Sequence, residues 1–403
     1  MFFLFLKIYL LHFLIVPLGT YFISKKENNY ITYSTQLIYG IILISFSALL
    51  LNFFLPLNNT INSITILFLL TFIYRHLKNF FLDIEFYIFC FLSTLIISLL
   101  IIGSNVYRPD AGLYHLPYIN ILNNEKIIIG LSNLHFRYAH ASILQHTSAI
   151  LNNFVIGING IVLPSALIFS AILLNFISRT FNLIKLNKYN IEFYFLIFVQ
   201  IFMFYKMNRY SEYGNDTPSH LLFFYLLSLI LKNQFNIKEV LNTFLLILFI
   251  ILNKIILILS FFFIFLIWDK IKIFDFFKYK RLYFISIFFT IWVIKNLLIS
   301  GCLIFPVTSL CFDNFKWSNK SLSKNVSIEN EAWAKGWPDY INKSKKNDKL
   351  LKIDQYSKNF NWVSTWSSKH FLFMINIISI YLSLSFILNK AMSVKKSQPK
   401  TNP

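Results

Sequence analysis

The chain has 403 residues, of which 57% are hydrophobic and only 13% are charged. A water-soluble protein of this length could not bury so much apolar surface, so the composition excludes a soluble globular protein and predicts an integral membrane protein. The formal net charge of +20 does not indicate a nucleic-acid partner, because Lys and Arg lie mostly between the apolar segments, where they act as orientation signals. We therefore expect the lipid bilayer, and no nucleic acid, as a partner.

Eleven apolar segments predict an all-α polytopic membrane protein with about 11 transmembrane helices. They lie near residues 2–23, 33–56, 61–77, 83–103, 155–178, 191–207, 218–232, 239–252, 255–268, 282–300 and 370–389. Several are shorter than the roughly 20 residues that a straight crossing needs. Lys254 favours a pair of helices in the 239–268 region over one tilted helix, because a cation at bilayer depth is costly.

The basic residues predict the orientation of the chain. When the loops alternate sides, one side receives Lys25, Lys26, Arg75, Lys78, Arg179, Lys185, Lys188, Lys232, Lys238, the run from Lys270 to Arg281, Lys390, Lys395, Lys396 and Lys400. The positive-inside rule makes this side cytoplasmic, which puts the N-terminus outside and the C-terminus in the cytoplasm. The outer face then holds residues 104–154, 208–217 and 301–369.

This topology divides the chain into four parts. Residues 1–300 are the multi-span transmembrane domain with outer-face loop helices, 301–369 a small helical periplasmic cap, 370–389 the last transmembrane helix and 390–403 a cytoplasmic tail. Five Trp residues lie in the cap, where they act as interfacial anchors or stack on sugar faces. Cys302 and Cys311 show no metal-ligand spacing; they pair in an oxidising compartment or, as we expect, stay two unpaired thiols.

The stretch from Tyr107 to Ser148 concentrates titratable side chains in a chain that is otherwise poor in charge. After Pro109, the side chains of Asp110, Tyr114, His115 and Tyr118 follow at helical spacing, which predicts that they meet one another or one ligand. A solvated loop between two helices is the alternative interpretation.

The second outer loop, KMNRYSEYGNDTPSH, adds two acids and two cations. Asp216 or Thr217 is a candidate N-cap of the following helix, which would be a purely structural role. The functional interpretation is a second acidic group, Glu212 or Asp216, that faces Asp110 across the outer mouth of the bundle. Lys206, Arg209 and the helix N-terminus would then form an anion site beside it.

These residues suit an acid–base reaction at the outer face of the membrane. Asp110 is the candidate general base, with His115 as the alternative, and both are assigned as catalytic. The candidate phosphate-binding and substrate-binding residues are Arg108, Tyr114, Tyr118, His135, Arg137, Lys206, Arg209, Glu212, Asp216 and Lys254.

No cofactor is firmly implied. The separations between His135, His140 and His146 do not place two His ligands on one helical face, so no dedicated transition-metal site is expected. A loosely held Mg²⁺ or Mn²⁺ ion between Asp110 and Glu212 or Asp216 is the more plausible metal.

Three short motifs carry a family resemblance: DAGLYHLPYI, GLSNLHFRYAHAS and the late KNLLISGCLIFP. Together with the layout of the spans they resemble a bacterial subgroup of the C-type (GT-C fold) multi-span membrane glycosyltransferase superfamily. The resemblance implies an inner-membrane enzyme that uses a polyprenyl-phosphate sugar donor and a glycan or lipid acceptor, with Asp110 at the position of the catalytic acid. Asp110 is single here, without a DE, ED or DxD pair, and it follows four apparent spans instead of one, which puts metal dependence and the order of the early spans in doubt.

Other functions remain open at this point. A transporter or flippase of a lipid-linked glycan or anionic solute would place charged residues within spans, where Lys254, Lys295 and Asn296 are the only strong candidates. An O-antigen-polymerase-like enzyme would use a large outer loop such as 301–369, and a membrane scaffold would leave the acidic cluster without a role. Lys254 separates the first two classes: at an outer helix break it can bind phosphate, whereas in a central cavity it suggests transport.

Overall fold

The computed structural model describes residues 2–23, 29–81, 83–103, 109–140, 142–210, 212–232, 235–267, 279–344, 351–358 and 360–397. All regular elements in these ranges are helices, with no strand, which confirms the all-helical prediction. The chain divides into two compact units, Met1–Leu303 (unit 1) and Ile304–Pro403 (unit 2). Each unit is described by itself.

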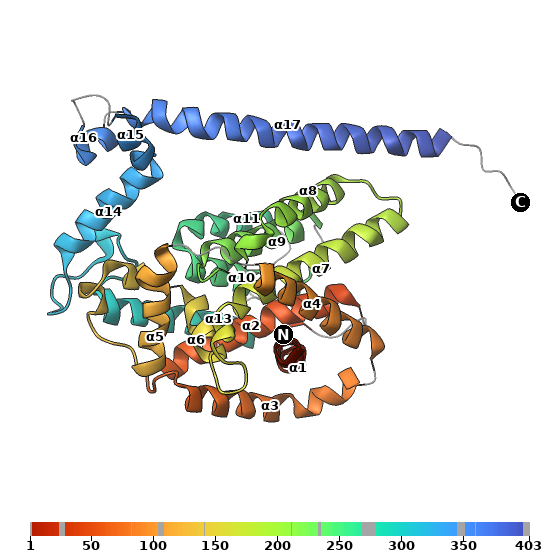
Figure 1. Ribbon diagram of the computed structural model, residues 1–403, viewed down its shortest axis with the longest axis horizontal. Helices are drawn as coiled ribbons and strands as arrows, with labels where there is room; N and C mark the ends of the chain where they lie inside the picture. The colour runs from red at the N-terminus through yellow and green to blue at the C-terminus, as the bar shows by residue number, and fades with distance from the viewer. Residues whose placement is uncertain are drawn as a thin grey trace, which may run out of the picture. The chain divides into compact units, whose positions relative to one another are not determined.

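Unit 1 is a bundle of apolar helices (Figure 1). Its longer helices are α1 (Phe2–Gly19), α2 (Tyr30–Asn52), α3 (Asn59–Phe81), α4 (Ile84–Gly103), α7 (Leu163–Lys185), α8 (Ile191–Tyr205), α9 (Asp216–Lys232), α10 (Ile237–Asn253) and α13 (Lys280–Ser300), and η6 (Ile255–Phe262) with α11 (Phe263–Ile267) follows α10. Among the described residues, five helices are long and apolar enough to cross a membrane: α1, α2, α4, α7 and α13. The protein is therefore a helical membrane protein; the count of 11 spans and their orientation stay predictions.

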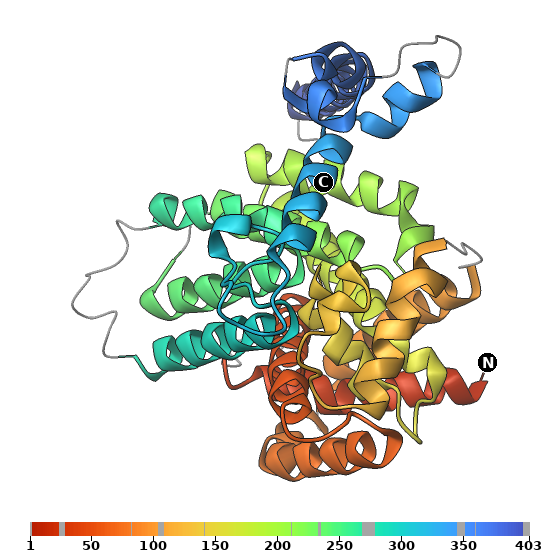
Figure 2. The ribbon, with the colours of Figure 1, turned by 90° about the vertical axis from the view of Figure 1, so that its left-hand side faces the viewer.

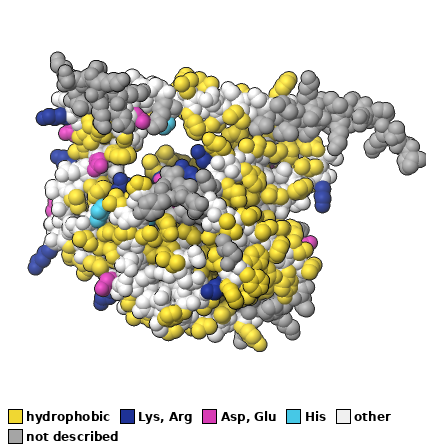
Figure 3. Space-filling view, in the orientation of Figure 1, with side chains coloured by type: hydrophobic (Ala, Val, Ile, Leu, Met, Phe, Trp, Pro, Cys, Tyr) yellow, Lys and Arg dark blue, Asp and Glu magenta, His cyan; other side chains and the backbone are white. Residues whose placement is uncertain are grey.

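The surface agrees with a lipid environment. Hydrophobic side chains cover much of the face shown in Figure 3, and charged side chains are sparse on it. Inside the bundle, α1 packs closely on α2 through two glycines. A Cβ atom at Gly19 would overlap the carbonyl oxygen of Gln36, and one at Gly40 would overlap that of Ile15. Small residues thus allow the two backbones to approach, as is common between membrane helices.

The connections of unit 1 gather at two ends, and hydrogen bonds define both. At one end, Ile127 N–H donates to Asn52 O at 3.0 Å, and Gly130 N–H donates to Leu298 O at 2.8 Å. We call this the site end; it also holds Gly214, Asp216 and the break between helices at Lys254. Several connections between helices of unit 1 therefore lie together at the site end.

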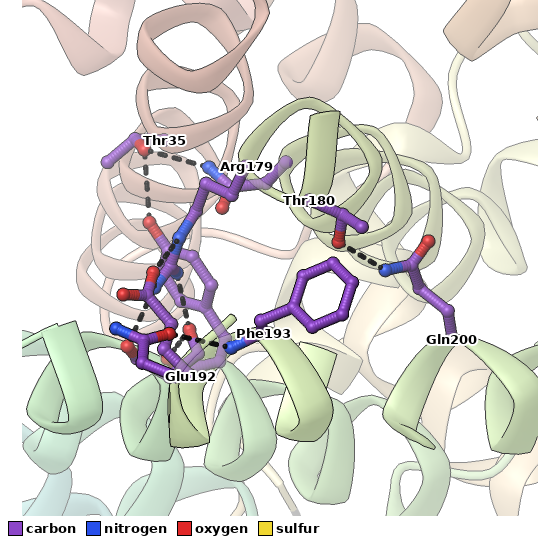
Figure 4. Close-up of polar contacts among 10 residues, drawn as sticks. Thr35, Arg179, Thr180, Glu192, Phe193 and Gln200 are labelled. Atoms are coloured by element: carbon purple, nitrogen blue, oxygen red, sulfur yellow. Dashed lines mark hydrogen bonds and ion pairs between the residues drawn. The ribbon is translucent and has the colours of Figure 1, made fainter. Parts of the chain in front are cut away.

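The opposite, far end is held by a buried ion pair (Figure 4). Arg179 of α7 donates through Nη2 to Glu192 Oε1 of α8 at 2.6 Å and through Nη1 to Ser228 Oγ of α9 at 2.7 Å. Both charged side chains are more than nine-tenths buried. Close by, the Tyr33 hydroxyl donates to Asp83, which ties α2 to the start of α4. Because three helices meet at one guanidinium, this network fixes their register.

Short helices fill the site end between α4 and α7, and Figure 2 faces them (orange to yellow). They are η1 (Ala111–His115), α5 (Leu116–Asn124), η2 (Leu131–Asn133), η3 (Phe136–His140), α6 (Ile143–Leu151) and η4 (Ile158–Ile161). The predicted span 155–178 starts late, at Leu163, because Gly157 adopts a positive φ of 77° that no helix interior allows. The helix then runs on to Lys185.

Unit 2 contains η8 (Thr308–Leu310), α14 (Lys320–Ala334), α15 (Trp337–Ser344), α16 (Ile353–Lys358) and α17 (Trp362–Ser397). An aromatic cluster joins α15 to α16: the Tyr340 and Tyr356 ring centroids lie 4.7 Å apart, and those of Trp337 and Tyr356 lie 5.1 Å apart. Apolar side chains such as Phe371 and Phe386 are exposed along α17, which contains the predicted last span.

The expectation of two unpaired thiols at Cys302 and Cys311 is wrong. Cys302 and Cys311 are both disulfide-bonded, and Cys90 is buried with a free thiol. The sequence favoured two unpaired thiols because spacing alone carries no information on how a loop folds back. A disulfide is typical of an oxidising compartment.

Candidate functional site

Asp110 and Tyr114 meet at the start of the short-helix segment. Leu116 N–H donates to Ala111 O five residues earlier, so residues 111–115 form a π-helical turn, a geometry that is frequent at functional sites. The Tyr114 side chain lies beside the Asp110 carboxylate. Burial and the negative charge of Asp110 raise the pKa of Tyr114 to about 12. Tyr114 thus keeps its proton beside an exposed carboxylate.

His115 lies beside this pair. Its Nδ1 atom is 3.1 Å from Nε2 of Gln145, which belongs to α6. Burial lowers the pKa of His115, and the positive charge of Arg137 lowers it further, while Asp110 and Asp216 raise it. The net shift is downward, so the imidazole is neutral at pH 7.

His135, which directly precedes η3, and Arg137 of η3 lie against the Tyr114 ring. The rings of Tyr114 and His135 are stacked with centroids 6.4 Å apart, and the Arg137 guanidinium lies 5.3 Å from the Tyr114 ring centroid. A cation over a π face is attracted to it without losing its charge. Arg137 therefore stays available to an anion while its position is fixed.

A second carboxylate approaches from α9. Lys254 Nζ lies 2.9 Å from Asp216 Oδ1, and Asp216 is close enough to shift the pKa values of both Tyr114 and His115. Lys254 has extended backbone angles (φ −147°, ψ 102°) and marks the end of α10 before η6. The lysine thus lies at a helix break at the site end, the position that the sequence associates with phosphate binding.

The remaining predicted residues lie at the edge of this cluster or apart from it. Arg209 Nε is 3.5 Å from Glu212 Oε1, so Glu212 is engaged with Arg209. Lys206 lies over the ring of its neighbour Tyr205, 4.6 Å from the centroid, and no described contact brings it to Asp110. Arg108 lies outside the described residues.

Tyr118 belongs to a deeper, buried layer. Its ring stacks on Tyr138 with centroids 5.7 Å apart and meets the edge of His146 at 6.3 Å. Burial, reinforced by the positive charge of Lys295, lowers the pKa of His146 to about 3. Lys295, on α13, is 1% exposed and lies 5.3 Å from the Trp292 ring centroid. A buried lysine thus lies near His146, in the same layer as Tyr118.

The N-terminal cap of α6 connects the two halves of the site, and sequence reasoning missed it. Ser142 Oγ donates to Asn253 Oδ1 at 2.8 Å, and Gln145 Oε1 accepts from Ser142 N–H at 3.1 Å. Asn253 directly precedes Lys254, while Gln145 holds His115. The signal was present in the sequence, because Ser142 and Gln145 form the S-x-x-Q pattern of a capping box.

The cluster therefore holds Asp110, Tyr114, His115, His135, Arg137, Asp216 and Lys254 together, with two carboxylates and two cations. Such a set can accept a proton and bind an anion within one site. In the part of the chain that the structure describes, no three His, Cys, Asp or Glu side chains are grouped as a metal site. The Mg²⁺ or Mn²⁺ ion stays a prediction from the sequence.

Comparison with known proteins places the chain in a family without assigning it an activity. No curated protein and no solved structure matches it significantly. One family model, described as a domain of unknown function (DUF8201), matches residues 1–400. Because the match covers almost the whole sequence, the chain belongs to the DUF8201 family.

Proposed function

We propose that the protein is a membrane glycosyltransferase of the bacterial inner membrane that moves a sugar from a polyprenyl-phosphate donor to an acceptor hydroxyl on the periplasmic face. The observation that carries this proposal is the convergence of Asp110 and Asp216 with Arg137 and Lys254 at one end of an apolar helix bundle. A base and an anion site beside the membrane are what transfer from a lipid phosphate needs.

Each side chain of the cluster has one role in the proposed reaction. Asp110 accepts the proton of the acceptor hydroxyl as its oxygen attacks the anomeric carbon of the donor sugar. The bond from this carbon to the phosphate oxygen breaks with inversion, and polyprenyl phosphate leaves with its electron pair. Lys254 and Arg137 stabilise the negative charge of the leaving phosphate, and the protonated Tyr114 hydroxyl beside Asp110 can donate to its carboxylate.

Two further observations support an outer location. The disulfide-bonded state of Cys302 and Cys311 suits the periplasm, where disulfides persist. The basic residues near the far end, including Arg179 and Arg281, are typical of cytoplasmic loops. Lipid-linked donors and their acceptors are available at the outer face without a nucleotide sugar.

A flippase or transporter of a lipid-linked glycan is the second candidate. The buried Lys295 of α13, beside His146, favours it, because a cation inside a span is often part of a transport path. Lys254 favours the transferase, because it lies at a helix break beside Asp216 and not in the middle of a helix.

The test is the lipid-linked glycan profile of cells with the wild-type protein, with Asp110→Asn, or with no protein. We expect both defective strains to accumulate a glycan that is short by one sugar, because an amide cannot take the proton. A full-length glycan retained on the inner face would support the flippase instead, and an unchanged profile would contradict both.

Asp313→Asn is the matched control. Asp313, like Asp110, is an exposed carboxylate, but it lies in unit 2, where it pairs with Lys320 at 2.8 Å. The control should leave the profile as in the wild type. Equal membrane levels of both variants, shown by immunoblot, exclude a loss of insertion.

A further inference from the structure

The amide of Gln145 has only one orientation that satisfies its neighbours. One end lies 3.1 Å from the backbone nitrogen of Ser142, which carries a hydrogen and can only donate. That end is therefore the carbonyl oxygen, and the NH₂ group lies at the other end, 3.1 Å from Nδ1 of His115. Since an NH₂ group only donates, Nδ1 of His115 must present its lone pair.

This contact fixes the tautomer of His115. A neutral imidazole carries one proton, so a ring that accepts at Nδ1 carries its proton on Nε2. The charged groups that face the ring are Asp110 from η1, Arg137 from η3 and Asp216 from α9. A doubly protonated His115 ring would bring an N–H group against the NH₂ group of Gln145. The contact with Gln145 therefore disfavours the imidazolium form of His115.

The Nε2 atom faces Gly214. A Cβ atom at this glycine would lie 3.7 Å from Nε2, an ordinary van der Waals contact. Gly214 is not among the described glycines with positive φ, so its backbone does not require glycine. The missing side chain instead leaves room next to the Nε2–H group, in the same loop that leads to Asp216.

We propose that Gln145 is a positioning residue that holds His115 as an Nε2–H donor to a hydroxyl group of the bound sugar substrate. A hydroxyl both donates and accepts, so it is complementary to a carboxylate acceptor paired with a neutral imidazole donor. The leaving phosphate is assigned to Lys254 and Arg137, so a sugar hydroxyl is the ligand that fits the Nε2–H donor beside Asp110 and Asp216. This assignment rests on the proposed function for the identity of the ligand, and it gives His115 a donor role instead of the alternative-base role expected from the sequence.

Gln145→Glu tests the positioning step without removing the cap of α6, because Glu satisfies a capping box as well as Gln does. Full-length protein with ¹⁵N-labelled His is reconstituted in lipid and its ring nitrogens are observed by NMR at neutral pH, with His115→Asn used to assign the His115 signals. In the wild type we expect an unprotonated Nδ1 and a protonated Nε2. In Gln145→Glu, the carboxylate accepts from the ring and Nδ1 becomes protonated.

Gln200→Glu is the matched control, because Gln200 also donates through Nε2, to Thr180 Oγ1 at 2.9 Å, and is remote from His115. It should leave the His115 signals unchanged. A protonated Nδ1 in the wild-type protein, or an Nδ1 that stays unprotonated in Gln145→Glu, would overturn the positioning role. This result does not depend on any enzymatic activity.

The ligand is tested with the lipid-linked glycan that accumulates in cells lacking the protein. At alkaline pH we expect the KM of Gln145→Glu for this acceptor to be about tenfold above that of the wild type, the effect of about one hydrogen bond. The difference should shrink as the pH falls, because a second ring proton restores the Nε2–H donor. A deficit that is constant with pH, or an unchanged KM, would refute recognition of the hydroxyl. Failure of the wild-type protein to extend this glycan would reject the proposed function and with it this ligand, while the NMR result would still decide the tautomer.

Discussion

Replacing Arg179 with Met breaks the buried ion pair at the far end and leaves the Glu192 carboxylate without its cation (Figure 4). The substitution removes two hydrogen bonds to Glu192 Oε1, at 2.6 and 3.2 Å, and two to Ser228, at 2.7 and 2.8 Å. Removing one partner of a buried pair costs about 3–5 kcal/mol, because the other charge stays desolvated. We therefore expect Arg179→Met to lower the free energy of unfolding by about that amount.

The assay is equilibrium unfolding of the purified protein in detergent, compared with the double variant Arg179→Met/Glu192→Leu. Removing both charges leaves no unpaired ion, so the double variant should recover most of the lost stability. If Arg179→Met lowers the free energy of unfolding by less than about 1 kcal/mol, the buried ion pair does not have this stabilising role. A double variant that is no more stable than the single one would contradict it as well.

The remaining predictions concern the site end. Lys254→Met should raise the KM for the lipid-phosphate donor about tenfold or more through loss of a charged contact. The matched control is Lys320→Met, which removes a lysine whose Nζ lies 2.8 Å from Asp313 and should leave this KM unchanged. Equal KM values for the two variants would count against a phosphate role of Lys254. The second prediction is that the free energy of unfolding decreases as the pH falls. His146 has a folded-state pKa of about 3 against an ordinary value of 6.5, so the unfolded chain binds a proton that the folded chain does not. Stability from His146 is therefore complete above pH 6.5 and declines as the pH falls toward about 3, by about 1.4 kcal/mol for each pH unit. Thermal unfolding between pH 7 and 5 should show this slope, and His146→Leu should reduce it; an identical slope in the variant would exclude His146 as its source.

Local spacing predicted the contact at the centre of the site. Asp110 and Tyr114 are four residues apart, and in the folded chain their side chains lie close enough for Asp110 to raise the pKa of Tyr114, even though residues 111–115 form a π-helical turn. Lys254 at a helix break followed from the cost of burying a cation.

Contacts between distant segments could not be predicted in the same way. Asn253 and Ser142 are separated by 111 residues, and nothing in either neighbourhood indicates the other. Likewise, Lys295 reads as an isolated charge in an apolar run, and only the packing of α13 brings it near His146. The disulfide of Cys302 and Cys311 depends on the path of a loop, which periodicity does not define.

Transfer by the purified protein is the most direct test of the proposed function. The full-length chain is reconstituted in liposomes with polyprenyl-phosphate sugars and the truncated lipid-linked glycan from cells that lack it, and the products are identified by mass spectrometry. We expect the wild-type protein to extend the glycan by one sugar, Asp110→Asn to fail to extend it, and Asp313→Asn to extend it like the wild type. Equal extension by wild type and Asp110→Asn would contradict the role of Asp110, and no extension by the wild-type protein would contradict the transferase itself.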